Sequence, residues 1–544
     1  GGAGGWRAMA VRRLTRREWL KGSGGAALAL AWAALGGAGC AVRRSPEDLA
    51  RRLVIGISDD IKTLDPAYQT RALDGSIIVQ IHEPLTWFDR SNRLGPRLAV
   101  HWESPDNGLT WDFHLREGVA FHDDTELDAQ AVKFHFDRIA DPKTASNRFT
   151  HMKHVGSIEA VARHVVRFRM KRPFSVWPEV VRDPFGGIVS PQAVRRCADP
   201  REYWRSPVGT GPFRFVEHVP ERRILLRRNP TYWDKTAALA EEVEFRPVRE
   251  TTTRVILLEQ GQLDIAGVFW AHAEAVRRAR RVRLEQVPWL AIRYIGFNNM
   301  KPPFSDVRVR RAANYAIDRE AIVKYAFRGN ADPARGPLPA SLPAFNHDME
   351  TYGFDPDRAR ALMREAGLAG GTDVVMWAMD SVTDKIIAET VMEQLRAVGI
   401  RVKVQQFDSA VYWDKFDAYQ TSDGKWFPTR EGVFDMFIDG WVGGESAYGY
   451  LDPLFRSTSS SNAAFYKNDE VDRLLEQVMA VTDAAARDEI YRQLQAVIMA
   501  DAPWVFTYHS HIIQGVNPRV QGYRVHPAGD YILQNVSLGM IGRV

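Results

Sequence analysis

The sequence is poor in cysteine and short of apolar runs, and these absences narrow what it can encode. Only Cys40 and Cys197 among its 544 residues are cysteines, so at most one disulfide could form within the chain. The N-terminal apolar stretch, Ala26–Leu35, is well below the ~20 residues that a bilayer-spanning helix needs, which argues against a membrane anchor. The sequence also has neither a P-loop nor a dinucleotide-binding fingerprint.

The net positive charge of the chain comes from its first residues alone. The formal charge is +5, but residues 1–39 carry six basic side chains and one acidic one, which is also a net +5. The rest of the chain is therefore close to neutral. Runs of arginine such as Arg277–Arg281 then read as solvated faces, and nucleic-acid binding is not supported.

The first 40 residues have the plan of an export signal. A basic segment that includes Arg16 and Arg17 precedes the apolar stretch, and small residues follow it up to Cys40. The segment around Arg16 and Arg17 resembles a twin-arginine signal, which a receptor reads as an address. Cys40 resembles the lipid-modified cysteine of bacterial lipoproteins, although Gly37 stands where leucine is usual. We therefore expect an extracytoplasmic protein tethered by lipid at Cys40, with Cys197 left as a buried, unpaired thiol.

The remaining sequence predicts an α/β protein with more than one lobe, because single cores stop growing at about 250–300 residues. Helix–strand alternation in the second half indicates βαβ units and a parallel or mixed sheet. A polar stretch over residues 420–432 is predicted to be a long loop. The patterns predict strands over 53–57, 111–115, 165–170, 400–404 and 504–508, and helices over 127–139, 307–325, 355–366, 383–398 and 471–500.

Several segments carry a family resemblance, and they occur in the family's order. They are Leu64–Pro66, Asp106–Val119, Gly209–Phe213, Arg228–Trp233, Gly261–Ile265 and Phe304–Ala312. Together they resemble the bacterial extracellular solute-binding proteins of family 5, the oligopeptide and dipeptide receptors of ABC importers. The resemblance spans residues 53–530 and implies a bilobed periplasmic-binding-protein fold of class II type, with an extra subdomain inserted in lobe one.

Carried over to this chain, the resemblance implies an order of domains. The export signal occupies 1–39 and the lipid tether 40–52. Lobe one consists of 53–88, 212–298 and 508–544, the inserted subdomain of 89–211, and lobe two of 299–507. The two crossings between the lobes, near 298–304 and 504–508, would be the hinge about which the lobes close on a ligand.

The resemblance also implies candidate ligand-binding residues. Peptide-binding members carry tryptophan and, three residues later, an aspartate that pairs with the peptide ammonium. Here Trp441 matches, Gly444 replaces the aspartate, and Glu445 could supply the charge unless it is a surface acid. Trp413 resembles a pocket-lining tryptophan. Arg430 could hold a carboxylate in bidentate fashion or be a solvated loop charge, and Tyr68 is a further candidate.

The function that these residues imply is a solute-binding receptor, a monomer without a cofactor or metal, whose partners are its ligand and the permease subunits of an ABC transporter. Di- or oligopeptides are the first choice of ligand, and oligosaccharides, opines, glutathione and metal complexes stay open. A rival interpretation is an exported serine hydrolase, because Gly444–Tyr448 nearly spells a nucleophile elbow around Ser446. Tyr448 stands where that motif needs glycine, and the following residues do not predict a clear helix. We therefore expect no enzyme.

Overall fold

The architecture is built on one long mixed sheet. The computed structural model describes residues 44–237, 239–279, 281–417 and 434–539. Residues 50–544 form one compact unit, separate from residues 1–49, and this unit carries every described strand. Ten strands follow the order β16-β15-β17-β13-β18-β11-β1-β10-β9-β8, and β12 and β14 pair with β18 outside that path. The predicted mixed sheet is therefore present.

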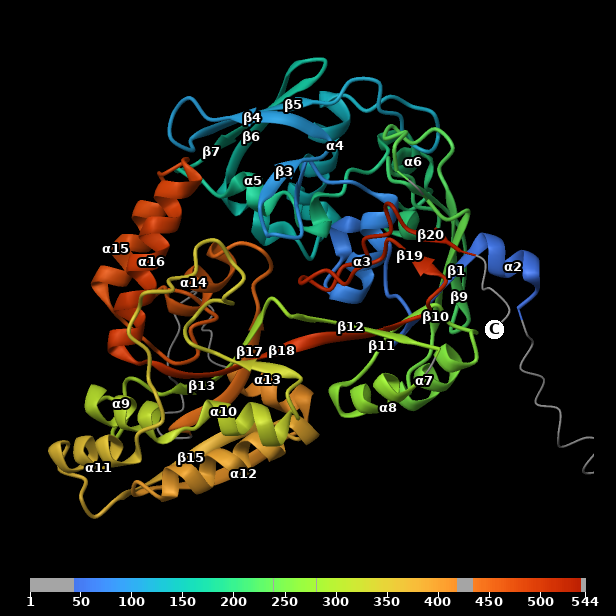
Figure 1. Cartoon of the computed structure of the whole chain (residues 1–544). Helices are drawn as coiled ribbons and strands as arrows, with labels where there is room; N and C mark the ends of the chain where they lie inside the picture. The colour runs from blue at the N-terminus through green and yellow to red at the C-terminus, as the bar shows by residue number, and fades with distance from the viewer. Residues whose placement is uncertain (1–43, 238, 280, 418–433, 540–544) are drawn as a thin grey trace, which may run out of the picture. The chain divides into compact units, whose positions relative to one another are not determined.

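Strand β18, Trp504–Val516, joins the two halves of this sheet (Figure 1). Its first residues pair antiparallel with β13, Ala291–Phe297, and its last six pair with β12, Arg283–Pro288. The prediction ended this strand at residue 508, but pairing on both sides buries most of its residues as far as Val516. The hinge crossing expected near 504–508 thus lies inside an unbroken strand.

The half of the sheet beyond β18 encloses a core with helix α3. Strand β1 is buried along five of its six residues and runs parallel to both β10 and β11, which explains its uninterrupted apolar sequence. Helix α2, Pro46–Arg51, precedes β1 in the chain. The elements of this half are β1 Arg52–Ile57, α3 Ala72–Ile81, β8 Phe213–Val219, β9 Arg223–Arg228, β10 Glu242–Pro247, α7 Thr251–Glu259, β11 Ile265–Gly267 and α8 Ala273–Arg278.

A separate antiparallel sheet, in the order β4-β5-β7-β6, lies within residues 99–170. Its strands are β4 Ala99–Glu103, β5 Thr110–Leu115, β6 Val155–Ala162 and β7 Val165–Met170, and α4 Ala129–Ala140 contacts β6 and β7. The alternation that predicted a strand at 111–115 buries Trp111, Phe113 and Leu115. Asp128 caps α4 by accepting from the Ala131 N–H, which places the helix start two residues later than predicted.

The other half of the large sheet carries parallel strands covered by helices. Strands β15 and β16 pair in parallel and α12 contacts both of them, as the helix–strand alternation predicted. The strands and helices of this second half are α9 Val307–Ala316, α10 Arg319–Ala321, η7 Ile322–Ala326, β14 Ala331–Pro333, α11 Pro356–Glu365, β15 Thr372–Met379, α12 Val382–Arg396, β16 Ile400–Phe407, α13 Ser409–Asp417, β17 Met436–Val442, α14 Tyr448–Phe455, α15 Asp469–Val478 and α16 Ala484–Asp501.

Two predicted helices are each broken into shorter ones. The helix expected over 307–325 ends at Ala316, and Asp318 caps a new turn by accepting from the Ala321 N–H. The helix expected over 471–500 is divided into α15 and α16, with Asp483 capping the second by accepting from the Ala486 N–H. An aspartate that satisfies the free N–H groups of a new helix start outweighs continued periodicity.

The remaining elements are short. They are η1 Pro66–Tyr68, β2 Thr86–Phe88, β3 Leu94–Pro96, η2 Pro142–Thr144, η3 Phe149–His154, α5 Trp177–Val180, η4 Pro184–Gly186, α6 Pro191–Arg196, η5 Pro200–Arg205, η6 Trp270–His272, β19 Val520–Gln521 and β20 Ser537–Leu538. The loop predicted at 420–432 lies outside the described residues. None of the helices in the described part of the chain is both long and apolar enough to cross a membrane.

Candidate functional site

The residues that follow β17 fold into a tight turn. Gly444 adopts φ +71°, a conformation that side chains other than glycine rarely adopt, so an aspartate in that position would be strained. A Cβ on Gly443 would lie 2.5 Å from a Tyr450 ring carbon, so that position is also closed to a side chain. The turn therefore disfavours a side chain at positions 443 and 444, and the carboxylate of this segment belongs to Glu445.

Glu445 is a buried acid with a buried cation against it. Its side chain is 3% exposed and forms an ion pair with Arg182, whose side chain is 7% exposed. Arg182 lies between α5 and η4, and its guanidinium also packs on the Trp87 ring, 4.6 Å from the ring centroid. The prediction that Glu445 could be a surface acid is therefore wrong.

A second carboxylate completes the ion cluster. Arg182 Nη2 donates to Asp530 Oδ2 at 2.6 Å, across 348 residues of sequence. Asp530 lies between β19 and β20 near the C-terminus. Three distant segments therefore bring one guanidinium and two carboxylates together in a buried position. Burial of such charges is costly unless they are paired, and each of these has an opposite charge within reach.

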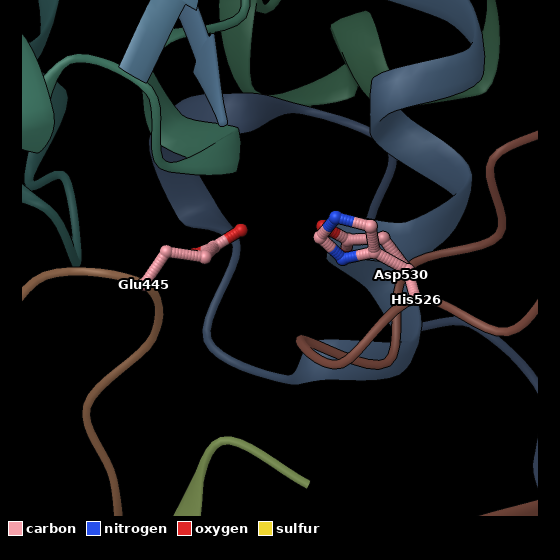
Figure 2. A group of neighbouring side chains, drawn as sticks. All are labelled: Glu445, His526 and Asp530. Atoms are coloured by element: carbon pink, nitrogen blue, oxygen red, sulfur yellow. The ribbon is translucent and has the colours of Figure 1, made fainter. Parts of the chain in front are cut away.

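His526 lies beside these carboxylates. Donor atoms of Glu445, His526 and Asp530 are all within 4.8 Å of one another. Figure 2 shows the Glu445 carboxylate and the His526 ring facing each other, with Asp530 beside the ring. Such a donor set could hold a divalent cation, but Arg182 already provides the positive charge between the two carboxylates. We therefore define the charged cluster as Arg182, Glu445, His526 and Asp530.

The environment shifts the pKa values of two members of the charged cluster in opposite directions, and in each case burial favours the neutral form. Burial raises the pKa of Glu445 to about 7; Asp530 adds to this rise and Arg182 opposes it. Burial lowers the pKa of His526 to about 4, with Asp530 opposing the shift. Near neutral pH the imidazole is therefore uncharged, and Glu445 can gain or lose a proton in response to a neighbour.

Three polar atoms of the charged cluster are buried and make no hydrogen bond with any described residue. They are Arg182 Nε, Glu445 Oε1 and His526 Nε2. Glu445 Oε1 lies within ion-pair distance of Arg182 Nη2 but not in hydrogen-bond geometry. An unsatisfied buried polar group costs about 1–3 kcal/mol, but Glu445 Oε1 has the Arg182 guanidinium against it and the backbone of Asp89 faces the His526 ring.

The other predicted site residues lie in different surroundings. Trp441, in β17, donates from Nε1 to the Gly449 carbonyl at 2.7 Å and so braces the turn that carries Glu445. Tyr68 donates its hydroxyl to the Thr144 carbonyl at 2.7 Å. Trp413 is 42% exposed on α13. Of the predicted set, Trp441 and Glu445 belong to the same turn region, and Arg430 lies outside the described residues.

Ser446, the candidate nucleophile, has partners unlike those of a hydrolase. Its Oγ donates to the carboxylate of Glu179, which also accepts from Arg487. A carboxylate held by arginine does not replace the histidine base of a triad. A helix, α14, does follow this serine, contrary to the sequence-based expectation, because Pro453 is tolerated within it. These contacts do not support the hydrolase interpretation.

Of the residues in the cysteine and signal predictions, Cys197 lies within the described part of the chain. Cys40, Arg16 and Arg17 lie outside it. Cys197 is a free thiol at the end of α6, half-buried rather than buried as expected. Its Sγ donates to the Ala193 carbonyl at 3.4 Å, and burial raises the pKa of the thiol. It is therefore a weak nucleophile.

Sequence reasoning missed Arg182, His526 and Asp530. Arg182 belongs to no motif, and its partners are hundreds of residues away along the chain. The one local signal is the spacing of His526 and Asp530, four residues apart near the C-terminus. That spacing is too common to single out a site without the fold.

Comparison with known proteins identifies the family. The model of the bacterial extracellular solute-binding proteins, family 5, matches residues 93–462. The glutathione-binding protein GsiB of Pectobacterium atrosepticum is 30% identical over 505 residues, covering 91% of this chain and 96% of that protein.

Solved structures agree on the fold. HbpA2 from Haemophilus parasuis matches with a TM-score of 0.81 and 25% identity, over 90% of this chain and all of that one. The periplasmic binding protein DppA from Helicobacter pylori, in complex with the peptide STSA, matches with a TM-score of 0.72 and 24% identity, over 91% and 99% of the two chains. The predicted α/β bilobed periplasmic-binding-protein fold is thereby confirmed, and the chain belongs to the bacterial extracellular solute-binding proteins of family 5.

Proposed function

We propose that this chain is the extracytoplasmic receptor of an ABC importer, which captures a peptide-type solute between two lobes and delivers it to a membrane permease. The observation that carries the proposal is the charged cluster. Arg182 comes from the predicted inserted subdomain, Glu445 from predicted lobe two, and Asp530 from predicted lobe one. A ligand held there would contact the predicted inserted subdomain and both predicted lobes at once.

The ligand class follows from the charges. Glu445 is the residue predicted to receive a peptide ammonium, and Arg182 offers a guanidinium suited to a carboxylate. A saccharide offers no charge that could replace the Arg182–Glu445 ion pair. The relative GsiB is named for glutathione, which carries both kinds of group. These points favour a small peptide over a sugar.

The mechanism is a shift of population between open and closed lobes. A ligand stabilises the closed form only by binding it more tightly than the open form, and contacts from several segments at once provide that difference. The domain boundaries that follow from the family resemblance give the hinge. Strand β18, which pairs with both halves of the sheet, would connect the moving parts.

The location proposed is the outer face of the cytoplasmic membrane or the periplasm. The twin-arginine-like signal at Arg16 and Arg17 would direct export, and lipid on Cys40 would tether the mature protein beside its permease. Mass spectrometry of the mature N-terminus tests this directly. A lipidated cysteine at position 40 is expected, and an unmodified N-terminus elsewhere would contradict the tether.

The function is tested by native mass spectrometry of the purified protein, followed by thermal denaturation with peptides and saccharides. A bound ligand stabilises the folded protein by mass action and so raises the melting temperature. At a ligand concentration of one hundred times Kd, the free energy of unfolding rises by about 2.7 kcal/mol. We expect a co-purified or added small peptide to give the shift. A shift with saccharides and none with peptides would overturn the peptide class. Turnover of an ester or peptide that Ser446→Ala abolishes would overturn the receptor role.

A further inference from the structure

A column of alternating arginine and tryptophan side chains ends at the charged cluster. The guanidinium carbon of Arg116 lies 4.1 Å from the Trp233 ring centroid, and that of Arg97 lies 5.8 Å from the same centroid. Arg97 is also 5.9 Å from the Trp87 ring centroid, and Arg182 lies 4.6 Å from it. A cation within about 6 Å of an aromatic ring centroid is attracted to the face of the ring. We define these five residues as the arginine–tryptophan column.

The middle of the arginine–tryptophan column is held in place. Arg97 forms an ion pair with Glu83 at 2.8 Å. Its guanidinium also donates to Gln534 Oε1 at 3.0 Å and to the Tyr232 hydroxyl at 3.1 Å. Glu83 is 1% exposed and accepts from the Tyr232 hydroxyl at 2.8 Å. Arg97 therefore has little freedom to move, and it gives Trp87 a fixed neighbour.

Trp87 is also tied to the helix that precedes Arg182. Trp87 lies in β2, and the hydroxyl of the adjacent Thr86 donates to the Pro178 carbonyl of α5 at 2.6 Å. Arg182 follows the end of α5 by two residues. A hydrogen bond outside the charged cluster thus fixes the Trp87 backbone relative to the segment that carries Arg182.

The Arg182 guanidinium meets its carboxylates through a single nitrogen. Both of its ion pairs, with Glu445 and Asp530, end on Nη2. Its Nε is buried and makes no hydrogen bond with any described residue. A planar group held at one corner can swing about that corner unless something lies against its face. The Trp87 ring lies against the guanidinium, and arginine is well suited to stacking on an aromatic ring.

We propose that Trp87 is a positioning residue, whose ring holds the Arg182 guanidinium between the carboxylates of Glu445 and Asp530. This inference rests on the proposed function, in which the charged cluster receives a charge of the ligand. Trp87 acts through Arg182 and does not itself bind the ligand. The alternative is that Trp87 fills space, which requires an apolar side chain of suitable volume but no aromatic face.

The position of Arg182 affects the charge of Glu445. Burial raises the pKa of Glu445, and Arg182 opposes this rise. The carboxylates of Asp530 and Asp183 add to the rise. His526, the remaining member of the charged cluster, is uncharged near neutral pH because burial lowers its pKa to about 4. If Arg182 swung away from Glu445, the pKa of Glu445 should therefore rise further.

Two substitutions of Trp87 distinguish positioning from space filling. Trp87→Phe keeps an aromatic face and Trp87→Met does not, while both leave a similar space. We expect the midpoint of the Glu445 titration to be about 1 pH unit higher in Trp87→Met than in Trp87→Phe, because an opposite charge within about 4–6 Å lowers a carboxyl pKa by about 1–3. The midpoint is measured by NMR on protein labelled with carbon-13 glutamate, and the Glu445 signal is identified by its absence from Glu445→Gln. Equal midpoints in the two variants would overturn the inference.

A second ringless variant and a matched control complete this comparison. Trp87→Leu should behave as Trp87→Met does, so the result does not depend on the folding of one variant. The control is Trp204, whose ring centroid is also 4.6 Å from a guanidinium carbon, that of Arg205, but this arginine is 63% exposed. Trp204→Met should leave the Glu445 midpoint at its wild-type value. A shift as large as that of Trp87→Met would show that loss of any such ring moves the titration, and the inference would fail.

Calorimetry with tri-alanine separates this inference from the proposed function. We expect Trp87→Phe to bind tri-alanine nearly as tightly as the wild type does. Trp87→Met should bind it about tenfold more weakly at pH 7, because less of Glu445 is ionised and Arg182 is no longer held in place. Equal binding by the two variants would overturn the inference and leave the peptide receptor standing. A difference between their Glu445 midpoints, with no binding of tri-alanine or of any screened peptide, would support the positioning role and overturn the peptide receptor.

Discussion

Replacing Asp264 by asparagine should measure how strongly the C-terminal segment is tied to the sheet. Asp264 is fully buried, accepts from the Val54 N–H at 2.8 Å and forms a bidentate ion pair with Arg519, whose side chain is 1% exposed. Asparagine keeps the bond to Val54 but leaves the buried guanidinium without this counter-charge. Breaking a buried ion pair by removing one partner costs about 3–5 kcal/mol.

The size of the effect on melting follows from the length of the cooperative unit. Unfolding entropy is about 2.1 cal/mol/K per residue, so a unit of roughly 500 residues loses about 1 °C of Tm per kcal/mol. Asp264→Asn should therefore lower Tm by about 3–5 °C in differential scanning calorimetry. If the half that contains Asp264 unfolds by itself, the shift should be about twice as large, and the transition should split.

A matched control is available on the surface. Asp373 pairs with Arg401 between β15 and β16, but its side chain is 80% exposed, so Asp373→Asn should shift Tm by less than about 1 °C. Adding Arg519→Met to Asp264→Asn should recover part of the loss by removing the buried guanidinium that Asp264 no longer neutralises. If the Asp264→Asn shift equals that of Asp373→Asn, the reasoning from buried ion pairs is refuted.

Three further predictions concern binding and export. Glu179→Gln, which weakens the contacts of Glu179 with Ser446 and Arg487, should raise the Kd for the best peptide about tenfold by destabilising the closed form, as measured by calorimetry. Because burial raises the pKa of Glu445 to about 7 and an ammonium favours its ionised form, peptide affinity should fall by up to tenfold per pH unit as pH drops below 7. Replacing Arg16 and Arg17 together by lysine should block export of the folded protein, and cell fractionation would measure this block.

Each of these has a contradicting outcome. Glu159→Gln removes an exposed ion pair with Arg169 and serves as the control for Glu179; equal affinities in both variants would show that Glu179 does not stabilise the bound form. A peptide affinity that stays constant from pH 5.5 to 8 would show that Glu445 does not titrate on binding. Normal export of the double lysine variant would rule out the twin-arginine route.

Local patterns predicted most elements because they are set by neighbouring residues. The alternation at 111–115 and the apolar run at 53–57 each report which faces of a strand are buried, and the structure agrees. The helix breaks near Asp318 and Asp483 were not predicted, because a single capping aspartate can start a new helix within a sequence whose apolar periodicity continues. The length of β18 escaped because its burial depends on partners from both halves of the sheet.

The candidate site was predicted only where a sequence motif touched it. Glu445 was found because it lies one residue beyond the position at which peptide-binding members carry aspartate, in the segment where Trp441 matches the family. Arg182 and Asp530 give Glu445 its environment, but their proximity is a property of the fold and not of any local pattern. The burial of Glu445, which raises the pKa of its carboxyl group, could not be predicted before the fold was known.

The shared strand β18 has a consequence for any attempt to divide this protein. Its first residues complete the ladder of β13 and its last residues complete the ladders of β12 and β11. A cut just before β18 would remove the strand with which both halves pair and leave unpaired, aggregation-prone edges on β13, β12 and β11. The two halves of the sheet therefore have to be expressed and engineered together, as one polypeptide.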